Sequence, residues 1–202
     1  MDGVDERAHD LSAPLTGAQS PLPWSTAWGA VARCVATCVA MTCRREIRQP
    51  RDNVGRVIRF ANGTAGTVYR ETVAARATAT APCVLVVCFR LRGVHGRGHT
   101  LFRIESILNT PLFVGFPGFL SKLWLRHDDR GVYRGIYEWD GADRAEKYAR
   151  SLWRVLALVS EAPSIGYQVL PGLRRDDVLD DPDLAARRQQ EVGAWWQVVG
   201  SP

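Results

Sequence analysis

The residues of this chain best suited to chemistry lie in one apolar segment, residues 119–139. Five polar or aromatic side chains stand there among aliphatic ones: Lys122, Trp124, Tyr133, Tyr137 and Glu138. A base removed from water, together with polar donors that hold a developing negative charge, can carry out acid–base chemistry on a small molecule. The segment therefore predicts a ligand or reaction site inside an apolar domain.

Two structural interpretations of the same residues stay open. A Tyr or Trp on a strand also serves as core packing with its polar tip satisfied. Lys122 and Glu138 can form a cross-strand ion pair instead of contacting a ligand. The pattern thus marks a neighbourhood and does not assign a role to each residue.

A glycine-rich stretch, residues 93–99, adds His95 and His99. It lacks the Lys-Ser/Thr ending of a phosphate-binding loop, so we expect no phosphate site. Two histidines four residues apart could bind a metal on a helix, but the glycines favour a loop, so we expect no metal. His99 is then a candidate general base or hydrogen-bonding group.

The elements that must position these residues follow from hydrophobic periodicity. A β-branched strand and a short helix come first. Two strands joined by a short turn follow, then a helix with apolar residues at spacings of three and four, and a last strand. In chain order these are residues 82–93, 99–110, 119–126, 132–139, 142–160 and 164–172. The order is βαββαβ, which predicts an α+β, ferredoxin-like domain over residues 83–172.

Both faces of the hairpin 119–139 are apolar. Phe119, Leu123 and Leu125 alternate onto one side, and Leu120 and Trp124 onto the other. Helices of the same domain cover only one face of such a sheet, so the second face needs another cover. We expect a second copy of the chain to provide it, which predicts a homodimer.

Three short motifs resemble a known family. PGFLSKLW (117–124), RGIYEW (134–139) and AEKYA (145–149) are similar to YdhR-type monooxygenases, within the dimeric α+β barrel proteins that include the antibiotic biosynthesis monooxygenases. The resemblance covers residues 83–172. It implies a dimeric barrel with a ligand cavity, and oxygenation or cyclisation of an aromatic or polyketide-like substrate without any cofactor.

Such an enzyme needs a base, donors for the oxyanion and a dry pocket. We expect His99, Tyr137 and Tyr133 as catalytic residues. The expected substrate-binding residues are His95, Lys122, Trp124 and Glu138. The alternative is a non-catalytic dimeric module that binds a small molecule in the same cavity.

The flanking segments are predicted from composition and pattern. Residues 1–23 are predicted to be a disordered tail, 24–45 a helix, 46–82 a hairpin around Asn62-Gly63 with a linker, and 173–202 a helical tail with Asp181 as N-cap and Trp195-Trp196 as an anchor. That anchor fits the partner subunit or the chain's own domain. Met41 is an alternative start of translation.

Charge and cysteine content narrow the setting. The net charge is +5, but the arginines are scattered and no groove-reading motif accompanies them, so we expect no nucleic-acid partner. Five cysteines fit neither a disulfide framework nor a zinc site and predict a reducing compartment, the cytoplasm. Arg33 interrupts the segment 24–45, so we expect no membrane association.

Overall fold

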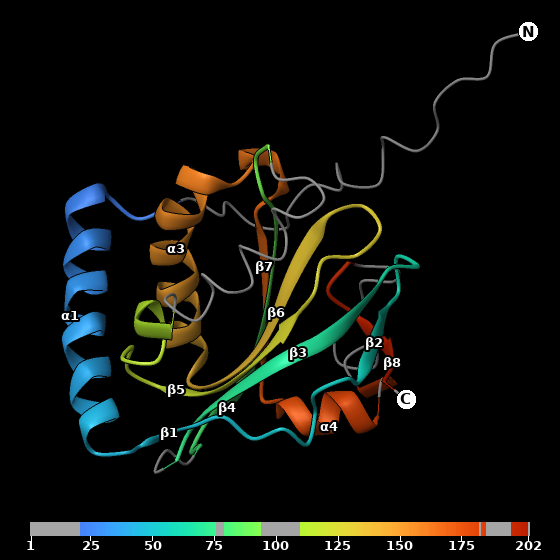
Figure 1. Ribbon diagram of the computed structural model, residues 1–202, viewed down its shortest axis with the longest axis horizontal. Coiled ribbons are helices and arrows are strands. Elements are labelled where there is room, and N and C mark those ends of the chain that lie inside the picture. Colours follow the sequence, from blue (N-terminus) through green and yellow to red (C-terminus); the bar gives the residue numbers. More distant parts are fainter. Residues whose placement is uncertain (1–20, 76–78, 94–109, 182, 185–194, 202) are drawn as a thin grey trace, which may run out of the picture.

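The computed structural model describes residues 21–75, 79–93, 110–181, 183–184 and 195–201. A curled eight-stranded sheet forms the middle of the molecule. Two long helices, α1 (Trp24–Cys43) and α3 (Ala142–Val159), lie on one side of it, and the short helix α4 (Arg175–Asp180) lies on the other (Figure 1).

The centre of the sheet has the predicted ferredoxin-like order. Strands β4 (Pro82–Arg90), β5 (Phe119–Leu125), β6 (Val132–Asp140) and β7 (Gly166–Pro171) lie in the order β7-β4-β6-β5, and all pairs are antiparallel. Helix α3 and the 3-10 turn η3 (Ala162–Ser164) connect β6 to β7. The α+β class is confirmed. The predicted helix 99–110 lies outside the described residues except for Thr110, which begins the 3-10 turn η2 (Thr110–Leu112).

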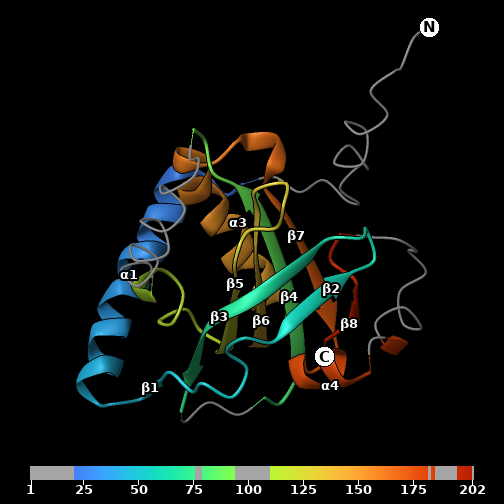
Figure 2. The same ribbon diagram turned by 45° about the vertical axis from the view of Figure 1, so that its right-hand side comes forward.

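The N-terminal hairpin extends this sheet. Strands β2 (Val57–Phe60) and β3 (Ala65–Ala74) turn around Gly63, whose φ of 78° suits glycine. Strand β3 pairs with β5, and the short strand β1 (Ile47–Arg48) pairs with the far end of β3. Figure 2 shows β3 and β2 crossing obliquely in front of β4 and β6, and the core on this side of the sheet joins residues of β2, β4 and β6.

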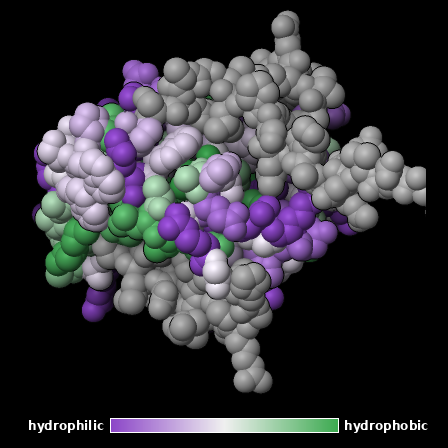
Figure 3. All heavy atoms as spheres, turned by 90° about the horizontal axis from the view of Figure 1, so that it is seen from above, coloured by the Kyte–Doolittle hydropathy of each residue, from purple (hydrophilic) through white to green (hydrophobic). Residues whose placement is uncertain are grey.

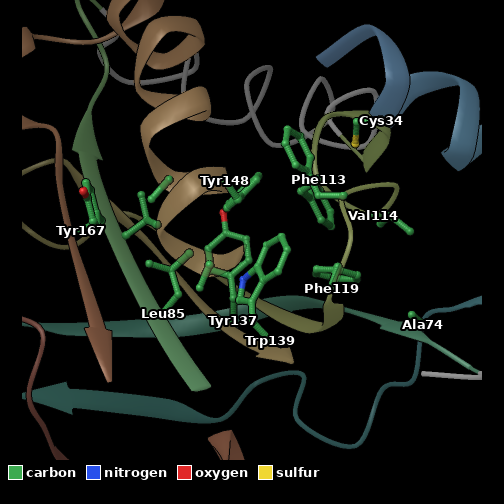
Figure 4. Close-up of a cluster of buried hydrophobic side chains, with 14 of the residues drawn as sticks. Cys34, Ala74, Leu85, Phe113, Val114, Phe119, Tyr137, Trp139, Tyr148 and Tyr167 are labelled. Atoms are coloured by element: carbon green, nitrogen blue, oxygen red, sulfur yellow. The ribbon is translucent and has the colours of Figure 1, made fainter. Parts of the chain in front are cut away.

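The helix-facing side of the sheet holds an aromatic core. Tyr148 of α3 packs on Trp139 and Tyr137 of β6, with ring centroids 4.8 and 5.5 Å apart (Figure 4). Helix α1 closes this core by burying Cys34 and Cys38. A Cβ at Gly115 would lie 2.0 Å from the Cys34 carbonyl oxygen, so glycine permits this close approach of α1.

The other side of the sheet is covered by the chain itself. Val84, Val86 and Ile136 pack there against residues of β2, α4 and strand β8 (Val198–Gly200), together with Trp196. Trp196 therefore anchors the C-terminal segment to its own domain. Since this face has a cover, it no longer argues for a second copy, and the homodimer remains a prediction that needs a different contact surface.

One strand departs from simple alternation. The register of β5 against β6 shifts between Phe119 and Ser121. Phe119 consequently packs edge-on against Trp139 on the helix-facing side, while Leu123 and Leu125 lie on the other. The prediction that Phe119 shares a face with these leucines was wrong because a β-bulge reverses side-chain direction.

Helix α1 keeps one side exposed. It has the length and apolar composition of a membrane-spanning helix, a test that core helices of soluble proteins also pass. Trp24 and Trp28 stack in the open, with centroids 6.4 Å apart, and Arg154 lies over Trp24. Seen from above, hydrophobic residues gather on the side of this face where α1 lies, beside hydrophilic ones (Figure 3).

The cysteines are mostly buried, and the C-terminal region is partly helical. Four cysteines, Cys34, Cys38, Cys83 and Cys88, are buried as small apolar groups, and Cys43 is exposed. The tail forms α4, which ends at Asp180. Most of the helix predicted beyond Asp181 lies outside the described residues.

Candidate functional site

A cavity of about 590 Å³ lies between the helix-facing side of the sheet and α3. This volume is in the range of small-molecule sites. Strands β3 to β6 supply its aromatic floor, and α3 supplies an aliphatic wall of Leu152, Val155, Leu156, Leu158 and Val159. The floor includes Tyr69, Phe89, Lys122, Trp124, Tyr133 and Tyr137.

Lys122 is the polar centre of this cavity. Strand β5 lies between β3 and β6, so Lys122 stands in register between Thr72 and Tyr137. Only 7% of the residue is exposed. Its Nζ lies 3.2 Å from the centre of the Trp124 ring, 4.5 Å from that of Phe113 and 4.6 Å from that of Tyr137. The amine is thus enclosed by three aromatic rings.

Among the described residues, the Lys122 amine lacks the partners that a buried ammonium requires. Within the described ranges, no carboxylate and no hydrogen-bond acceptor contacts Nζ. An ammonium carries three N–H donors, and ring faces attract the cation without accepting conventional hydrogen bonds from it. Burial therefore lowers the pKa of Lys122 well below its usual value, and the positive charge of Arg70 lowers it further.

The Arg70 guanidinium lies on the ring of Trp124, at 5.2 Å from its centre. It donates a hydrogen bond of 2.7 Å to Thr110 Oγ1, and the Trp124 indole donates one of 3.2 Å to Thr72 Oγ1. These contacts fix the indole and place a guanidinium against its ring.

Tyr137 and Tyr148 form a buried phenol pair. The Tyr148 hydroxyl donates to the Tyr137 hydroxyl at 3.3 Å. Burial is the main reason why the pKa of both phenols is raised above the usual value. Both groups hold their protons at neutral pH, so Tyr137 suits the role of a proton donor to an oxyanion and not that of a base.

Gly135 makes room for this arrangement. It lies opposite Trp124 in the sheet. A Cβ at this position would come within 2.8 Å of the Tyr137 ring and 3.3 Å of Lys122 Cε. A side chain here would therefore press on the two groups that shape the floor of the cavity.

Most of the predicted site residues on the hairpin meet in this cavity. Lys122, Trp124, Tyr133 and Tyr137 all line it, with Tyr133 stacked on Phe89 at 5.8 Å. Glu138 does not line the cavity. It pairs in register with Ser121 on the other side of the sheet, so the alternative of a Lys122–Glu138 ion pair is not formed. His95 and His99 lie outside the described residues.

Glu138 has a different setting. Burial raises the pKa of its carboxyl, and the nearby Arg175 acts in the opposite direction. Across the described part of the chain, no group of three or more His, Cys, Asp or Glu residues could hold a metal ion.

Sequence reasoning missed residues that come from distant elements. Tyr69 and Arg70 lie on β3, whose pairing with β5 the sequence does not indicate, and Tyr148 was predicted only as part of a helical stripe. One signal was present in the composition. Of 26 basic residues, only two are lysines, Lys122 and Lys147, and one of them lies within an apolar strand.

Comparison with known proteins adds little to this geometry. No family model matches the chain, and no curated protein matches it. A crystal structure of an uncharacterized ferredoxin-fold protein related to antibiotic biosynthesis monooxygenases, from Listeria monocytogenes 4b F2365, is similar with a TM-score of 0.38 and 12% identity. The match covers 55% of this chain and 66% of that one, just under two thirds of its length. The likeness concerns the fold and is distant.

Proposed function

We propose that the cavity binds an aromatic or polyketide-like small molecule and that Lys122 removes a proton from it, as the first step of oxygenation or cyclisation without a cofactor. The observation that carries the proposal is the Lys122 amine, enclosed by Trp124, Phe113 and Tyr137 and without an acceptor among the described residues. Its lowered pKa increases the fraction of uncharged amine that can act as a base.

Proton transfer is favourable in this setting for an electrostatic reason. A phenol, enol or activated C–H group that gives its proton to Lys122 becomes an anion beside a new ammonium. The ion pair then forms where each charge was disfavoured alone. The Tyr137 phenol supports this step as a hydrogen-bond donor.

Molecular oxygen is the oxidant in the oxygenation reaction. The substrate anion gives electrons to oxygen, one oxygen atom enters the product as a carbonyl, and the other leaves as water. An activated methylene group loses both hydrogens, which balances the reaction. The apolar wall of α3 would limit water in the cavity and favour this chemistry.

The experiment is oxygen consumption by the purified protein with a panel of polyphenols and no added cofactor. Lys122→Met should lower the rate by about 10²- to 10⁴-fold, the scale of a lost general base. Lys147→Met, at an exposed position on α3, is the matched control and should keep the rate. Tyr137→Phe should lower it by less, because a phenol donor assists the step.

Full activity in Lys122→Met would contradict the proposal, and His99 would then be the base to test. Tight binding of an aromatic ligand without any turnover would instead support the alternative, a non-catalytic module that binds a small molecule.

A further inference from the structure

The geometry points to a covalent site: we propose that Nζ of Lys122 forms an imine with the carbonyl group of an aromatic or aryl-alkyl aldehyde or ketone bound in the cavity. This inference rests on the buried Lys122 amine of the proposed function, and it names the substrate class as carbonyl compounds. It adds nucleophilic attack on carbon to the removal of a proton.

Access and freedom of the amine are the first requirement. Lys122 belongs to the lining of the cavity, and its Nζ is held by ring faces rather than by a carboxylate. A buried lysine paired with a carboxylate stays protonated and has no lone pair to offer. In the described structure no carboxylate contacts the Lys122 nitrogen, so this obstacle is absent there.

Shape and polarity of the walls are the second requirement. The rings of Trp124, Phe113 and Tyr137 surround Nζ, so a flat aromatic carbonyl compound can stack while its carbonyl carbon reaches the nitrogen. The cavity of about 590 Å³ admits such a molecule. Apolar walls also favour imine formation, since the reaction releases water.

The use of lysine at this position is the third observation. The chain has two lysines, and every other one of its 26 basic residues is an arginine. A guanidinium holds its proton and cannot serve as an amine nucleophile. The buried basic position on the cavity floor, Lys122, is thus one of the two side chains of the chain able to form an imine.

The chemical step balances without a further reactant. The Nζ lone pair attacks the carbonyl carbon, the carbonyl π electrons move to oxygen, and a proton moves from nitrogen to that oxygen to give a carbinolamine. Loss of water then gives the C=N bond. The Tyr137–Tyr148 phenol pair can protonate the departing hydroxyl, since both groups keep their protons. Substrates with an α-hydrogen can continue to an enamine, a carbon nucleophile suited to aldol-type ring closure.

The test is reductive trapping with benzaldehyde and sodium cyanoborohydride on the full chain, followed by peptide mapping. Hydride reduces the imine to a stable benzyl amine on the lysine that formed it. Lys147 is the internal control, because it is exposed on the same chain and its peptide separates from that of Lys122. Benzyl alcohol, which has the ring but no carbonyl, should compete for the cavity without forming an adduct.

We expect the folded protein to carry the benzyl group on Lys122 in at least about tenfold excess over Lys147, since each unit of lowered pKa changes the unprotonated fraction about tenfold. The excess should disappear in denaturant, where both peptides report equally. Equal labelling of the two lysines in the folded protein, or labelling of Lys147 alone, would overturn the inference.

Two further readouts keep this test separate from that of the proposed function. Lys122→Arg keeps a long basic side chain but removes the amine nucleophile, so it should lose the adduct while circular dichroism stays unchanged. Trapping needs no oxygen, so an adduct without oxygen consumption would sustain the imine and reject the oxygenation. Oxygen consumption without an adduct would do the reverse.

Discussion

The two sides of the sheet bury basic side chains in opposite ways. On the side covered by β2, β8 and α4, Arg134 contacts Asp128 and Arg175 contacts Glu71, each at 2.7 Å with all four side chains almost fully buried. On the helix-facing side, Lys122 is buried among aromatic rings without a carboxylate in the described structure.

Strand β3 carries charged residues on both of its faces. Glu71 and Arg70 are neighbours on this strand and point to opposite sides of the sheet. The Glu71 carboxylate accepts from Arg175 on one side of the sheet, while the Arg70 guanidinium lies on the Trp124 ring on the other. An uncompensated buried cation costs stability, whereas a compensated one preserves the fold. On the proposal above, Lys122 serves the ligand site, whereas the two ion pairs belong to the packed side of the sheet.

The largest effect is expected from breaking a compensated pair. Asp128→Ala should lower the free energy of unfolding by about 3–5 kcal/mol, because it strands the buried Arg134. The variant also removes the acceptor of the Arg130 and Val132 N–H groups, which shape the turn before β6. Denaturant unfolding measures the change.

Asp129→Ala is the matched control on the same turn. Its side chain is exposed, so the change should stay within about 0.5 kcal/mol. Equal effects of the two variants would mean that the Arg134–Asp128 pair contributes nothing special.

The next effect concerns the floor of the cavity. Gly135→Ala should destabilise the protein by about 1–3 kcal/mol, the usual range for overpacking, since its Cβ would press on Tyr137 and Lys122. It should also reduce benzyl labelling of Lys122. Gly200→Ala on β8 is the control, because nothing lies within 4 Å of a Cβ there. Unchanged stability and labelling in Gly135→Ala would show that the floor has more room than the structure gives it.

The third effect has the opposite sign and depends on pH. Between the lowered pKa of Lys122 in the folded state and the usual value of about 10.4, the unfolded chain holds a proton that the folded chain lacks. The contribution of Lys122 to the free energy of unfolding therefore rises with pH, by about 1.4 kcal/mol per unit in this window.

Lys122→Met removes this contribution. The variant should be more stable than the parent at neutral pH, and its advantage should shrink as the pH rises toward about 10.4. Denaturant unfolding across that range, with Lys147→Met as control, gives the difference. Parallel curves of unfolding free energy against pH for parent and Lys122→Met would show that burial does not lower the pKa of Lys122.

The predictable part of the fold is the part with local signals. The alternation of Val132 to Trp139 and the stripe of Ala145 and Tyr148 are written in consecutive residues, and β6 and α3 follow them closely. Gly63 likewise marks its turn. The cover of the second face was not predictable in this way, because β2, α4 and Trp196 meet only through the curl of the sheet.

The candidate site likewise has one part that local spacing predicts and another that it does not. Lys122, Trp124, Tyr133 and Tyr137 share a hairpin face, so spacing alone brought them together. Glu138 was included because it is a polar residue within an apolar hairpin, although period-two alternation puts it on the other side of the sheet from Lys122. Arg70 joins the site by long-range strand pairing, which the spacing of residues along a single strand does not encode.

The central claim is that the pKa of the Lys122 amine lies well below the usual lysine value, so that the amine can act as a base and nucleophile. With two lysines in the chain, selective ¹³C labelling at lysine Cε gives two side-chain signals, and Lys147→Arg assigns them. The account predicts that the Lys122 signal titrates well below the usual lysine pKa. A Lys122 signal that titrates at about 10.4, the usual value, would contradict it.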